Sequence, residues 1–376
     1  MVGVGACYRN IGVEIVGPVQ AMPSGGFIYM DGRELLRDLQ GGLVGLTWAQ
    51  IQAMRDWAQM GGTVLAVGDI VPLLFGWLSG LPYSFIGTAK SDYYLRDEAG
   101  TYKLGRVPPA GKRATASEPW ERWLMTRSIC LGVFPRDLIT TQELQVRGVR
   151  AVDAGNPMMD GFEILPFNAA APPQPLPLLL LPGSRTPEAY RNWQSLVAVL
   201  SGIMAVYPAV EFGVAAAPAL DYKIMGEALT VAGWTAVAQD EYRHGAARLK
   251  IAATFMEMAQ RATGAIAMAG TATEQFVGLG KPAIILPGSG PQFTPAFARA
   301  QTRLLGPSVT LVEDPEQVGP TLHKILTDPQ QRRAIYDNGR RRMGDPGAAA
   351  RIASQLLTWM GTGDQSLRTY PTPRTV

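Results

Sequence analysis

The sequence is poor in the residues that bind transition metals or form disulfide bonds. Its 376 residues include only two cysteines, Cys7 and Cys130, and two histidines, His244 and His323. Two cysteines cannot build a disulfide framework, and these four residues, spread along the chain, do not form a zinc-binding motif. We therefore expect free thiols in a reducing compartment and no metal site.

The chain also lacks a strong excess of either charge. Lysine and arginine number 34, aspartate and glutamate 31, and the formal net charge is +3. This balance argues against a nucleic-acid partner, because proteins that bind nucleic acids carry basic patches or stripes. Residues 1–10 have neither a charged n-region nor a small-residue cleavage pattern, so they do not form a signal peptide. Together these features predict a cytoplasmic protein.

One long stretch is nearly without charge. Residues 63–88 carry a single charged side chain, Asp69, and an uncharged window of roughly 18 residues is typical of a membrane-spanning helix. Here Gly68 and Gly80 divide the stretch. The pattern therefore favours two buried parallel strands with a helix between them, since such strands are apolar on both faces. The second strand is expected at Tyr83–Ile86.

Length and pattern together predict an α/β protein with two domains. A chain of 376 residues that is 47% hydrophobic is long enough for two separate cores. Apolar strands alternate with helical patterns, as they do in βα units. Residues 169–177 have the alanine- and proline-rich composition of a connector. The predicted parts are an N-terminal acceptor-side domain 1–165, a linker 166–177, a C-terminal nucleotide-sugar-binding domain 178–360 and a tail 361–376.

A turn of small residues before a short helix is the first candidate for a ligand site. The turn contains Gly270, Thr271 and Thr273, and amide groups at the start of a helix favour phosphate groups. Glu274 and Gln275 lie on the first turn of the helix, where a carboxylate can accept two ribose hydroxyls. The alternative is that these residues only cap the helix.

A second turn follows the predicted strand Leu178–Leu181. The amide groups of Gly183 and Ser184 could hold a diphosphate, and the guanidinium group of Arg185 could pair with its oxygens in a bidentate manner. The alternative is an ordinary turn at the end of a strand.

Asp69 is the candidate for catalysis. It lies at the carboxyl end of a predicted strand, which is the edge at which open α/β sheets bind ligands. Lys90, Ser91 and Asp92 follow the next strand and could contact an acceptor molecule. The alternatives are that Asp69 caps the helix that begins at Ile70, and that the three later residues are solvated.

Several short motifs carry a resemblance to a known family. They are Gly155-Asn-Pro157, Leu181-Pro-Gly-Ser-Arg185, and Gly270-Thr-Ala-Thr-Glu-Gln275 followed by Gly278-Leu-Gly-Lys-Pro282. In this order they resemble the donor-nucleotide segments of two-domain (GT-B) glycosyltransferases. The chain is most similar to a cyanobacterial family related to lipid-A-disaccharide synthase.

The resemblance implies a fold of two Rossmann-like domains that face a cleft. Its members have a first strand and a glycine-rich turn that would precede Met1 of this sequence. We therefore expect an N-terminal domain that lacks its first strand-helix unit.

The resemblance also implies transfer of a hexosamine or hexose from a UDP-sugar to an apolar or lipid-linked hydroxyl. Asp69 would take the hydroxyl proton. Arg185 and the amide groups around Gly183 and Thr271 would stabilise the departing diphosphate, and Gln292 would contact hydroxyls of the donor sugar. No Asp-x-Asp pair occurs in the sequence, so the motif that binds the divalent metal in the other major glycosyltransferase fold is missing. This favours a metal-independent reaction, and no cofactor is implied.

Further alternatives stay open. The same two-domain frame serves UDP-sugar epimerases or hydrolases, and a catalytically silent nucleotide-sugar-binding protein is also consistent with the sequence. Trp120 and Trp123 are spaced for one helix face, which fits core packing or contact with lipid. Residues 340–342 are three consecutive arginines, which fit a solvated face or attraction to an anionic membrane surface. A peripheral contact with the cytoplasmic face of a membrane therefore remains an alternative.

Overall fold

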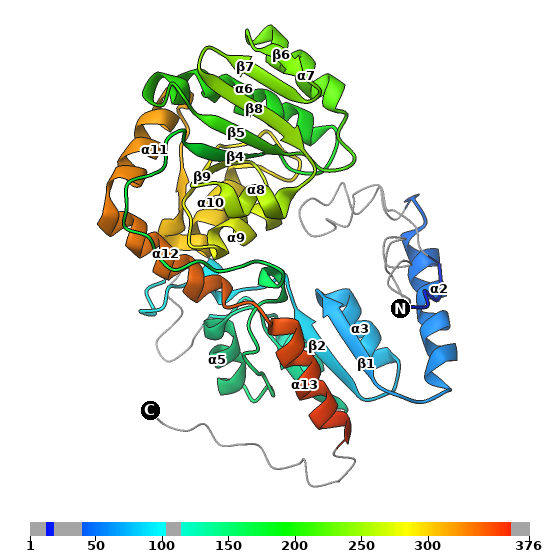
Figure 1. Ribbon diagram of the computed structural model, residues 1–376. Helices are drawn as coiled ribbons and strands as arrows, with labels where there is room; N and C mark the ends of the chain where they lie inside the picture. Colours follow the sequence, from blue (N-terminus) through cyan, green and yellow to red (C-terminus); the bar gives the residue numbers. More distant parts are fainter. Residues whose placement is uncertain (1–12, 19–39, 103–113, 362–376) are drawn as a thin grey trace. The chain divides into compact units, whose positions relative to one another are not determined.

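The computed structural model describes residues 13–18, 40–102 and 114–361 (Figure 1). The chain forms two compact units, and each unit combines separate parts of the sequence. The first unit takes the described residues up to Ser91, then Thr115–Ala154 and those from Ala350 onward. The second unit takes the described residues of Asp92–Ala114 and all of Gly155–Ala349.

A three-stranded parallel sheet forms the centre of the first unit. Its strands β1 (Val64–Gly68), β2 (Tyr83–Gly87) and β3 (Cys130–Phe134) lie in the order β1-β2-β3. Helix α3 (Ile70–Leu78) connects β1 to β2. The strand-helix-strand interpretation of the uncharged stretch is therefore confirmed. The other helices among the described residues of this unit are α2 (Leu43–Ala58), α4 (Pro119–Met125), α5 (Leu138–Val146) and most of α13 (Ala348–Gly361).

Apolar side chains cover both faces of this sheet. One cluster joins Ala66 and Tyr83 of the strands to Leu73 of α3 and Leu124 of α4. The other joins Phe134 and Ile86 to residues of α13, and the ring of Trp359 stacks on Phe134 at 5.2 Å between centroids. The first unit therefore has a core of its own, as the composition predicted.

The second unit contains an eight-stranded sheet in the order β11-β10-β9-β4-β5-β8-β7-β6. The first six strands in this order are parallel, whereas β7 and β6 form an antiparallel extension beside β8. Without that extension the order is that of a doubly wound Rossmann sheet, with its reversal between β4 and β9. The strands are β4 (Pro177–Leu181), β5 (Glu211–Ala215), β6 (Thr235–Ala238), β7 (Glu241–His244), β8 (Ala247–Ala252), β9 (Gly264–Ala267), β10 (Ala283–Ile285) and β11 (Val309–Leu311).

Helices lie on both faces of this sheet (Figure 1). Right-handed crossovers place the helices that follow β4 and β5 on one face, and those that follow β8, β9 and β10 on the other. Helix α11 packs against α6, and α12 packs against α9. The helices are α6 (Glu188–Val206), α7 (Tyr222–Val231), α8 (Phe255–Arg261), α9 (Thr271–Gly278), α10 (Pro295–Leu305), α11 (Val318–Thr327) and α12 (Pro329–Met343).

The compact units differ from the predicted domain ranges in three places. The second unit begins at Gly155 instead of after a linker at 166–177, and it also takes Asp92–Ala114 from the first half of the chain. Helix α13, predicted as part of 178–360, packs with the first unit from Ala350 onward. The reason is packing, because the apolar face of α13 completes the core around Phe134.

Two predictions concern the ends of the chain. The first is that the N-terminal domain lacks its first strand-helix unit. Residues 1–12 and 19–39 lie outside the described residues, so that expectation stays a prediction. The predicted tail at 361–376 lies outside them after Gly361. Within the described ranges, no helix has the length and apolar character needed to cross a bilayer.

The close packing of α12 on α9 yields a stability prediction. A Cβ atom on Gly339 would lie 2.1 Å from the carbonyl oxygen of Val277, so Gly339→Ala must push the two helices apart. We expect a loss of about 1–3 kcal/mol in the free energy of unfolding of the second unit. Chemical denaturation measures this loss.

Gly202→Ala is the matched control. Gly202 also lies inside a helix of the second unit, but its added Cβ would meet other atoms only at 3.8 Å or more. Because alanine favours helix, this variant should gain up to about 1 kcal/mol. Equal destabilisation by both substitutions would contradict the packing argument.

Candidate functional site

The strand order of the second sheet reverses between β4 and β9, so the loops at the carboxyl ends of these two strands are neighbours. Open α/β sheets bind ligands at such a reversal, because the two neighbouring loops lead to helices on opposite faces. The loop 182–187 follows β4, and residues 268–270 follow β9. The sequence analysis predicted these two turns as parts of a ligand site, and the parallel pairing of β4 with β9 brings them side by side.

The turn after β4 requires glycine and is tied to its neighbour. Gly183 has φ 94°, and a Cβ there would lie 3.2 Å from the carbonyl oxygen of Met268. The buried amide of Asn192 donates to the carbonyls of Pro182 at 3.1 Å and Met268 at 3.3 Å. Ser184 is exposed beside them. One side chain thus fixes the spacing of the two turns.

Arg185 is half-buried at the end of the same turn. Burial lowers the pKa of its guanidinium from the ordinary value, and the charge of Glu188 opposes this effect. Glu188 is buried, and its carboxylate accepts the backbone N–H groups of Gln292 at 3.1 Å and Phe293 at 2.6 Å. Arg191 donates to the carbonyl of Gly290 at 2.7 Å. The loop that carries Gln292 is therefore anchored to the first turn of α6.

Side-chain hydrogen bonds hold the backbone carbonyls of the turn before α9. The amide of Gln301 on α10, itself buried, donates to the carbonyls of Ala269 at 3.0 Å and Gly270 at 3.2 Å. The hydroxyl of Thr273 donates to Ala269 at 2.7 Å. The first amide groups of a helix have no acceptor within the helix, and Thr271 is exposed at this position. With the carbonyls occupied, the turn offers N–H groups to an anion.

The side chains of the first turn of α9 differ in their surroundings. Glu274 is only 8% exposed. Gln275 donates to the carbonyl of Met158 at 2.8 Å, within the short helix η4 (Pro157–Met159) that follows Gly155. Thr273 and Gln275 thus have backbone partners within the protein. Their direct contact with a nucleotide stays a prediction.

In the first unit, Asp69 caps a helix, as the alternative interpretation predicted. Its carboxylate accepts the N–H group of Val71 at 3.1 Å. It also lines a small cavity of about 30 Å³ at the carboxyl ends of the strands, together with Lys90, Glu121 and Thr140. This volume holds about two water molecules. The cap and the cavity are compatible, because a carboxylate has a second oxygen.

Two acidic residues beside this cavity were missed by the sequence analysis. Glu121 is buried and pairs with Lys90 at 2.7 Å. Asp137 is buried at the start of α5, and burial raises its pKa although hydrogen bonds from Ser91 and Thr140 oppose the shift. The available signal was position, since Asp137 follows β3 almost as Asp69 follows β1.

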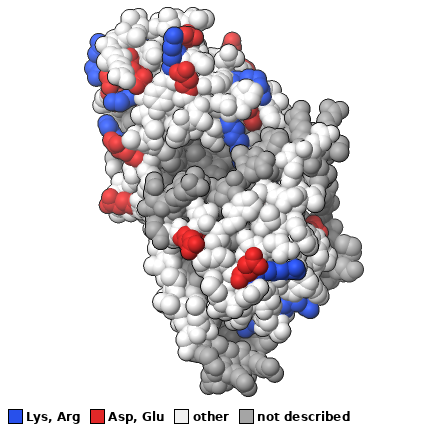
Figure 2. Space-filling view, turned by 90° about the vertical axis from the view of Figure 1, so that its right-hand side faces the viewer, with Lys and Arg blue, Asp and Glu red and all other residues white. Residues whose placement is uncertain are grey.

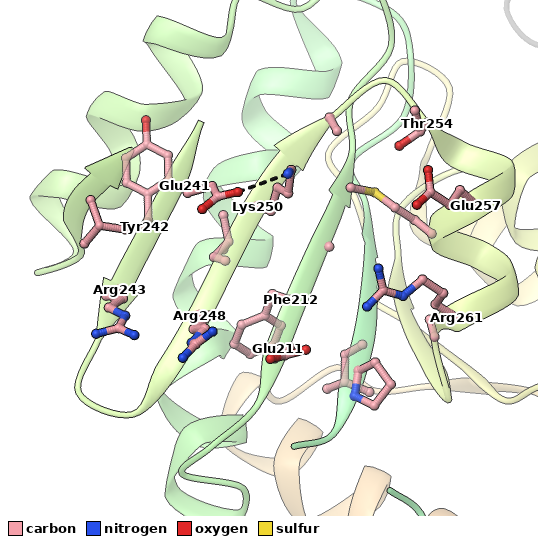
Figure 3. Close-up of a pocket in the computed structure, with 18 residues that line it drawn as sticks. Glu211, Phe212, Glu241, Tyr242, Arg243, Arg248, Lys250, Thr254, Glu257 and Arg261 are labelled. Carbon is pink, nitrogen blue, oxygen red and sulfur yellow. Dashed lines mark hydrogen bonds and ion pairs between the residues drawn. The ribbon is translucent and has the colours of Figure 1, made fainter. Parts of the chain in front are cut away.

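A second hollow, of about 680 Å³, lies on the sheet face between α8 and β7 (Figure 3). Both acidic and basic side chains line this hollow, and the ammonium group of Lys250 pairs with the carboxylate of Glu241 at 3.0 Å. Glu211 and Arg248 are register neighbours on adjacent strands. Alternating charge is typical of a water-exposed sheet face. This hollow contains none of the predicted donor residues, so the pair of turns after β4 and β9 is the candidate site. Among the described residues, no three or more His, Cys, Asp and Glu side chains are grouped to hold a metal ion.

Comparisons with known proteins support the fold. No protein-family model and no curated protein sequence matches the chain. The S. aureus protein MnaA, solved with UDP, matches with a TM-score of 0.53 and 13% identity over 93% of this chain and 89% of that one. A putative UDP-N-acetylglucosamine 2-epimerase from Listeria monocytogenes gives 0.52 and 13% over 87% and 83%. The calicheamicin glycosyltransferase gives 0.53 and 14% over 94% and 92%.

At these identities the comparisons establish the fold alone. The α/β, GT-B-like architecture implied by the resemblance is confirmed. A specific relation to lipid-A-disaccharide synthases stays a prediction.

Proposed function

We propose that this protein is a cytoplasmic, metal-independent glycosyltransferase. It moves a hexosamine or hexose from a UDP-sugar to an apolar or lipid-linked hydroxyl group, as the family related to lipid-A-disaccharide synthase would. The observation that carries the proposal is the pairing of two turns at the reversal of the second sheet, with Arg185 on one and the first amides of α9 on the other. Two neighbouring turns of this kind suit a diphosphate.

The donor diphosphate is proposed to lie between these turns. The amide groups of Gly183, Ser184 and Thr271 face it, and Arg185 supplies the positive charge. When the bond from the anomeric carbon to the diphosphate oxygen breaks, negative charge grows on that oxygen. Preorganised N–H groups and a guanidinium stabilise such charge without moving. This is the role that a metal ion fulfils in other transferases.

The remaining predicted residues receive roles around the diphosphate. Glu274 accepts two ribose hydroxyls from the low-exposure position that it has on α9. Gln275 and Thr273 position this turn through their backbone partners. Gln292 contacts hydroxyls of the donor sugar, which is supported by the anchoring of its loop to Glu188.

Asp69 is proposed as the general base. It takes the proton of the acceptor hydroxyl while that oxygen forms a bond with the anomeric carbon. The position of this half-buried residue beside a small cavity that Lys90 and Glu121 also line supports this role. Lys90, held by Glu121, supplies a positive charge near the same edge of the first sheet.

An apolar acceptor is supported by the surface of the first unit. Large apolar side chains are exposed on its helices α2, α3 and α4, and Trp48 and Trp120 are 60% and 49% exposed. Tryptophan is enriched where proteins meet the membrane interface. Uncharged surface also occupies wide areas of the face in Figure 2. We include peripheral contact with a membrane in the proposal on this ground.

The second candidate function is a UDP-sugar epimerase or hydrolase. It is favoured by several proteins of the same fold that are described as UDP-N-acetylglucosamine 2-epimerases, one of them as a putative one. Incubation with a labelled UDP-sugar and an apolar acceptor separates the candidates. A transferase yields labelled acceptor and UDP, an epimerase yields an isomeric UDP-sugar, and a hydrolase yields free sugar. A catalytically silent binding protein yields none of these products.

The donor site predicts a loss of UDP affinity on Glu274→Ala. Removing the carboxylate removes the hydrogen bonds to the ribose, so affinity should fall by about 1.5–3 kcal/mol. Titration calorimetry in excess chelator measures this, and UDP binding by the parent protein should survive the chelator. Glu227→Ala, at an exposed position of α7, should leave affinity unchanged. Unaltered UDP affinity in folded Glu274→Ala would remove this residue from the site.

The proposed base predicts a large loss of turnover on Asp69→Asn. Asparagine keeps much of the capping ability but cannot take the proton, so turnover should fall by roughly 10²–10⁴-fold. The melting temperature and UDP affinity should change little. Asp56→Asn, at an exposed position of α2, should retain full turnover. Full activity of the Asp69→Asn protein would leave this residue as a helix cap only.

The apolar surface predicts binding to lipid vesicles. The parent protein should sediment with vesicles, and Trp48→Ser and Trp120→Ser should each weaken this binding by about fivefold or more, because each removes a large apolar side chain. Val231→Ser changes a side chain that is 90% exposed on the second unit and should have no effect. Equal loss in all three variants, or no binding by the parent protein, would contradict membrane contact.

A further inference from the structure

A segment of the first half of the chain packs into the second unit. We call residues Asp92–Tyr102 the strap. It begins with a single helical turn, η2 (Asp92–Tyr94), and then doubles back through an antiparallel bridge between Arg96 and Tyr102. Asp92 and Tyr93 are buried. The strap is therefore an integral part of the second unit, although β2 and α4 on either side of it belong to the first.

The strap is held by the arginines at the end of α12. The guanidinium of Arg342 lies 4.3 Å from the centre of the Tyr93 ring. Glu98 pairs with Arg341 at 2.9 Å and with Arg342 at 3.4 Å. Burial raises the pKa of Glu98, but a backbone hydrogen bond and the two arginines outweigh this and lower it. The interpretation of residues 340–342 as a solvated face is therefore wrong for Arg342, which is buried.

Arg342 also closes the carboxyl end of α10. It donates to the carbonyls of Arg303 at 2.8 Å and Leu304 at 2.7 Å. The neighbouring Asn338 donates to the carbonyl of Leu305 at 2.7 Å. These carbonyls have no partner within the helix. Arg303 in turn donates to the carbonyl of Tyr94 at 3.2 Å. The strap, Arg342 and the end of α10 thus form one hydrogen-bonded assembly.

Helix α10 connects this assembly to the candidate donor site. Gln301 lies two residues before Arg303 and is the side chain that holds the carbonyls of Ala269 and Gly270. A shift of the end of α10 would therefore move Gln301 and alter the turn that precedes α9. In a close-packed interior, such shifts are transmitted instead of being absorbed.

We propose that Tyr93, Glu98 and Arg342 are positioning residues for the donor turn. None of them needs to touch the nucleotide. They fix the end of α10, α10 fixes Gln301, and Gln301 fixes the turn whose amide groups face the diphosphate. The ligand part of this inference rests on the proposed function, whereas the mechanical part concerns the protein alone.

Hydrogen exchange of the full chain tests the mechanical part without any ligand. Glu98→Gln keeps the shape of the side chain but loses the charge that pairs with Arg341 and Arg342. We expect exchange in a peptide covering residues 269–274 to accelerate about two- to fivefold, the size expected for a partly exposed ion pair. In Arg342→Lys, a single ammonium group cannot pair with Glu98 and also donate to both carbonyls of α10. Exchange in the same peptide should therefore accelerate about tenfold. The UDP dissociation constant should rise by similar factors.

Glu241→Gln is the matched control. Glu241 forms an exposed ion pair with Lys250 in the same unit, and its loss should leave exchange at residues 269–274 unchanged. Faster exchange in the strap with unchanged exchange at 269–274, in both Glu98→Gln and Arg342→Lys, would overturn the inference. Faster exchange at 269–274 in a protein that does not bind UDP would uphold the mechanical inference and overturn the proposed function instead.

Discussion

Two buried side-chain amides, those of Asn192 and Gln301, set the geometry on which the candidate site depends. Where β4 and β9 end, the following carbonyl groups leave the sheet but remain inside the protein, and a buried carbonyl without a partner is costly. Asn192 serves the carbonyls of Pro182 and Met268, and Gln301 serves those of Ala269 and Gly270. These carbonyls are held on the protein side, whereas the N–H groups of Gly183, Ser184 and Thr271 are the groups proposed to face the diphosphate.

The loop that carries Gln292 is held mainly by a side chain that accepts hydrogen bonds, whereas the two turns are held by side-chain amides that donate them. Glu188 accepts the N–H groups of Gln292 and Phe293, and Arg191 donates to the carbonyl of Gly290. Both side chains come from the first turn of α6, directly after Arg185. One short piece of sequence thus carries the proposed charge for the diphosphate and the supports for the sugar loop. Such a site is ordered before a ligand arrives, which reduces the entropy lost on binding.

The sequence predicted the features that depend on local patterns. The strands β1 and β2 and the two turns at Gly183 and Gly270 follow from apolar runs, breakers and small residues close together in the chain. It did not predict Gln275 donating to Met158, or Arg342 holding the strap, because the partners lie 117 and more than 240 residues apart. A polar residue on a helix has the same local pattern whether it is solvated or buried against a distant carbonyl.

The motif Gly278-Leu-Gly-Lys-Pro282 contributed to the resemblance to GT-B proteins, and in the structure its residues serve helix packing. A Cβ on Gly278 would collide with Met159, and one on Gly280 would collide with Tyr336. Lys281 donates to the carbonyls of Ala259 and Gln260 at the end of α8, and burial lowers its pKa to about 8. These residues seat α9 against its neighbours. The motif therefore contributes to the packing of the second unit, and none of these contacts assigns it a group for the chemistry.

The surroundings of Arg185 affect how well its positive charge could stabilise a leaving diphosphate in the proposed reaction. Burial lowers the pKa of this guanidinium, and the charge of Glu188, whose carboxylate also accepts two backbone N–H groups, opposes the shift. A charge in a half-buried position acts more strongly than it does in water, which suits Arg185 to the role proposed for it at the diphosphate. Glu188 also anchors the loop of Gln292 through two backbone N–H groups. In the proposed function, this one carboxylate therefore connects the loop at the donor sugar with the charge at the diphosphate.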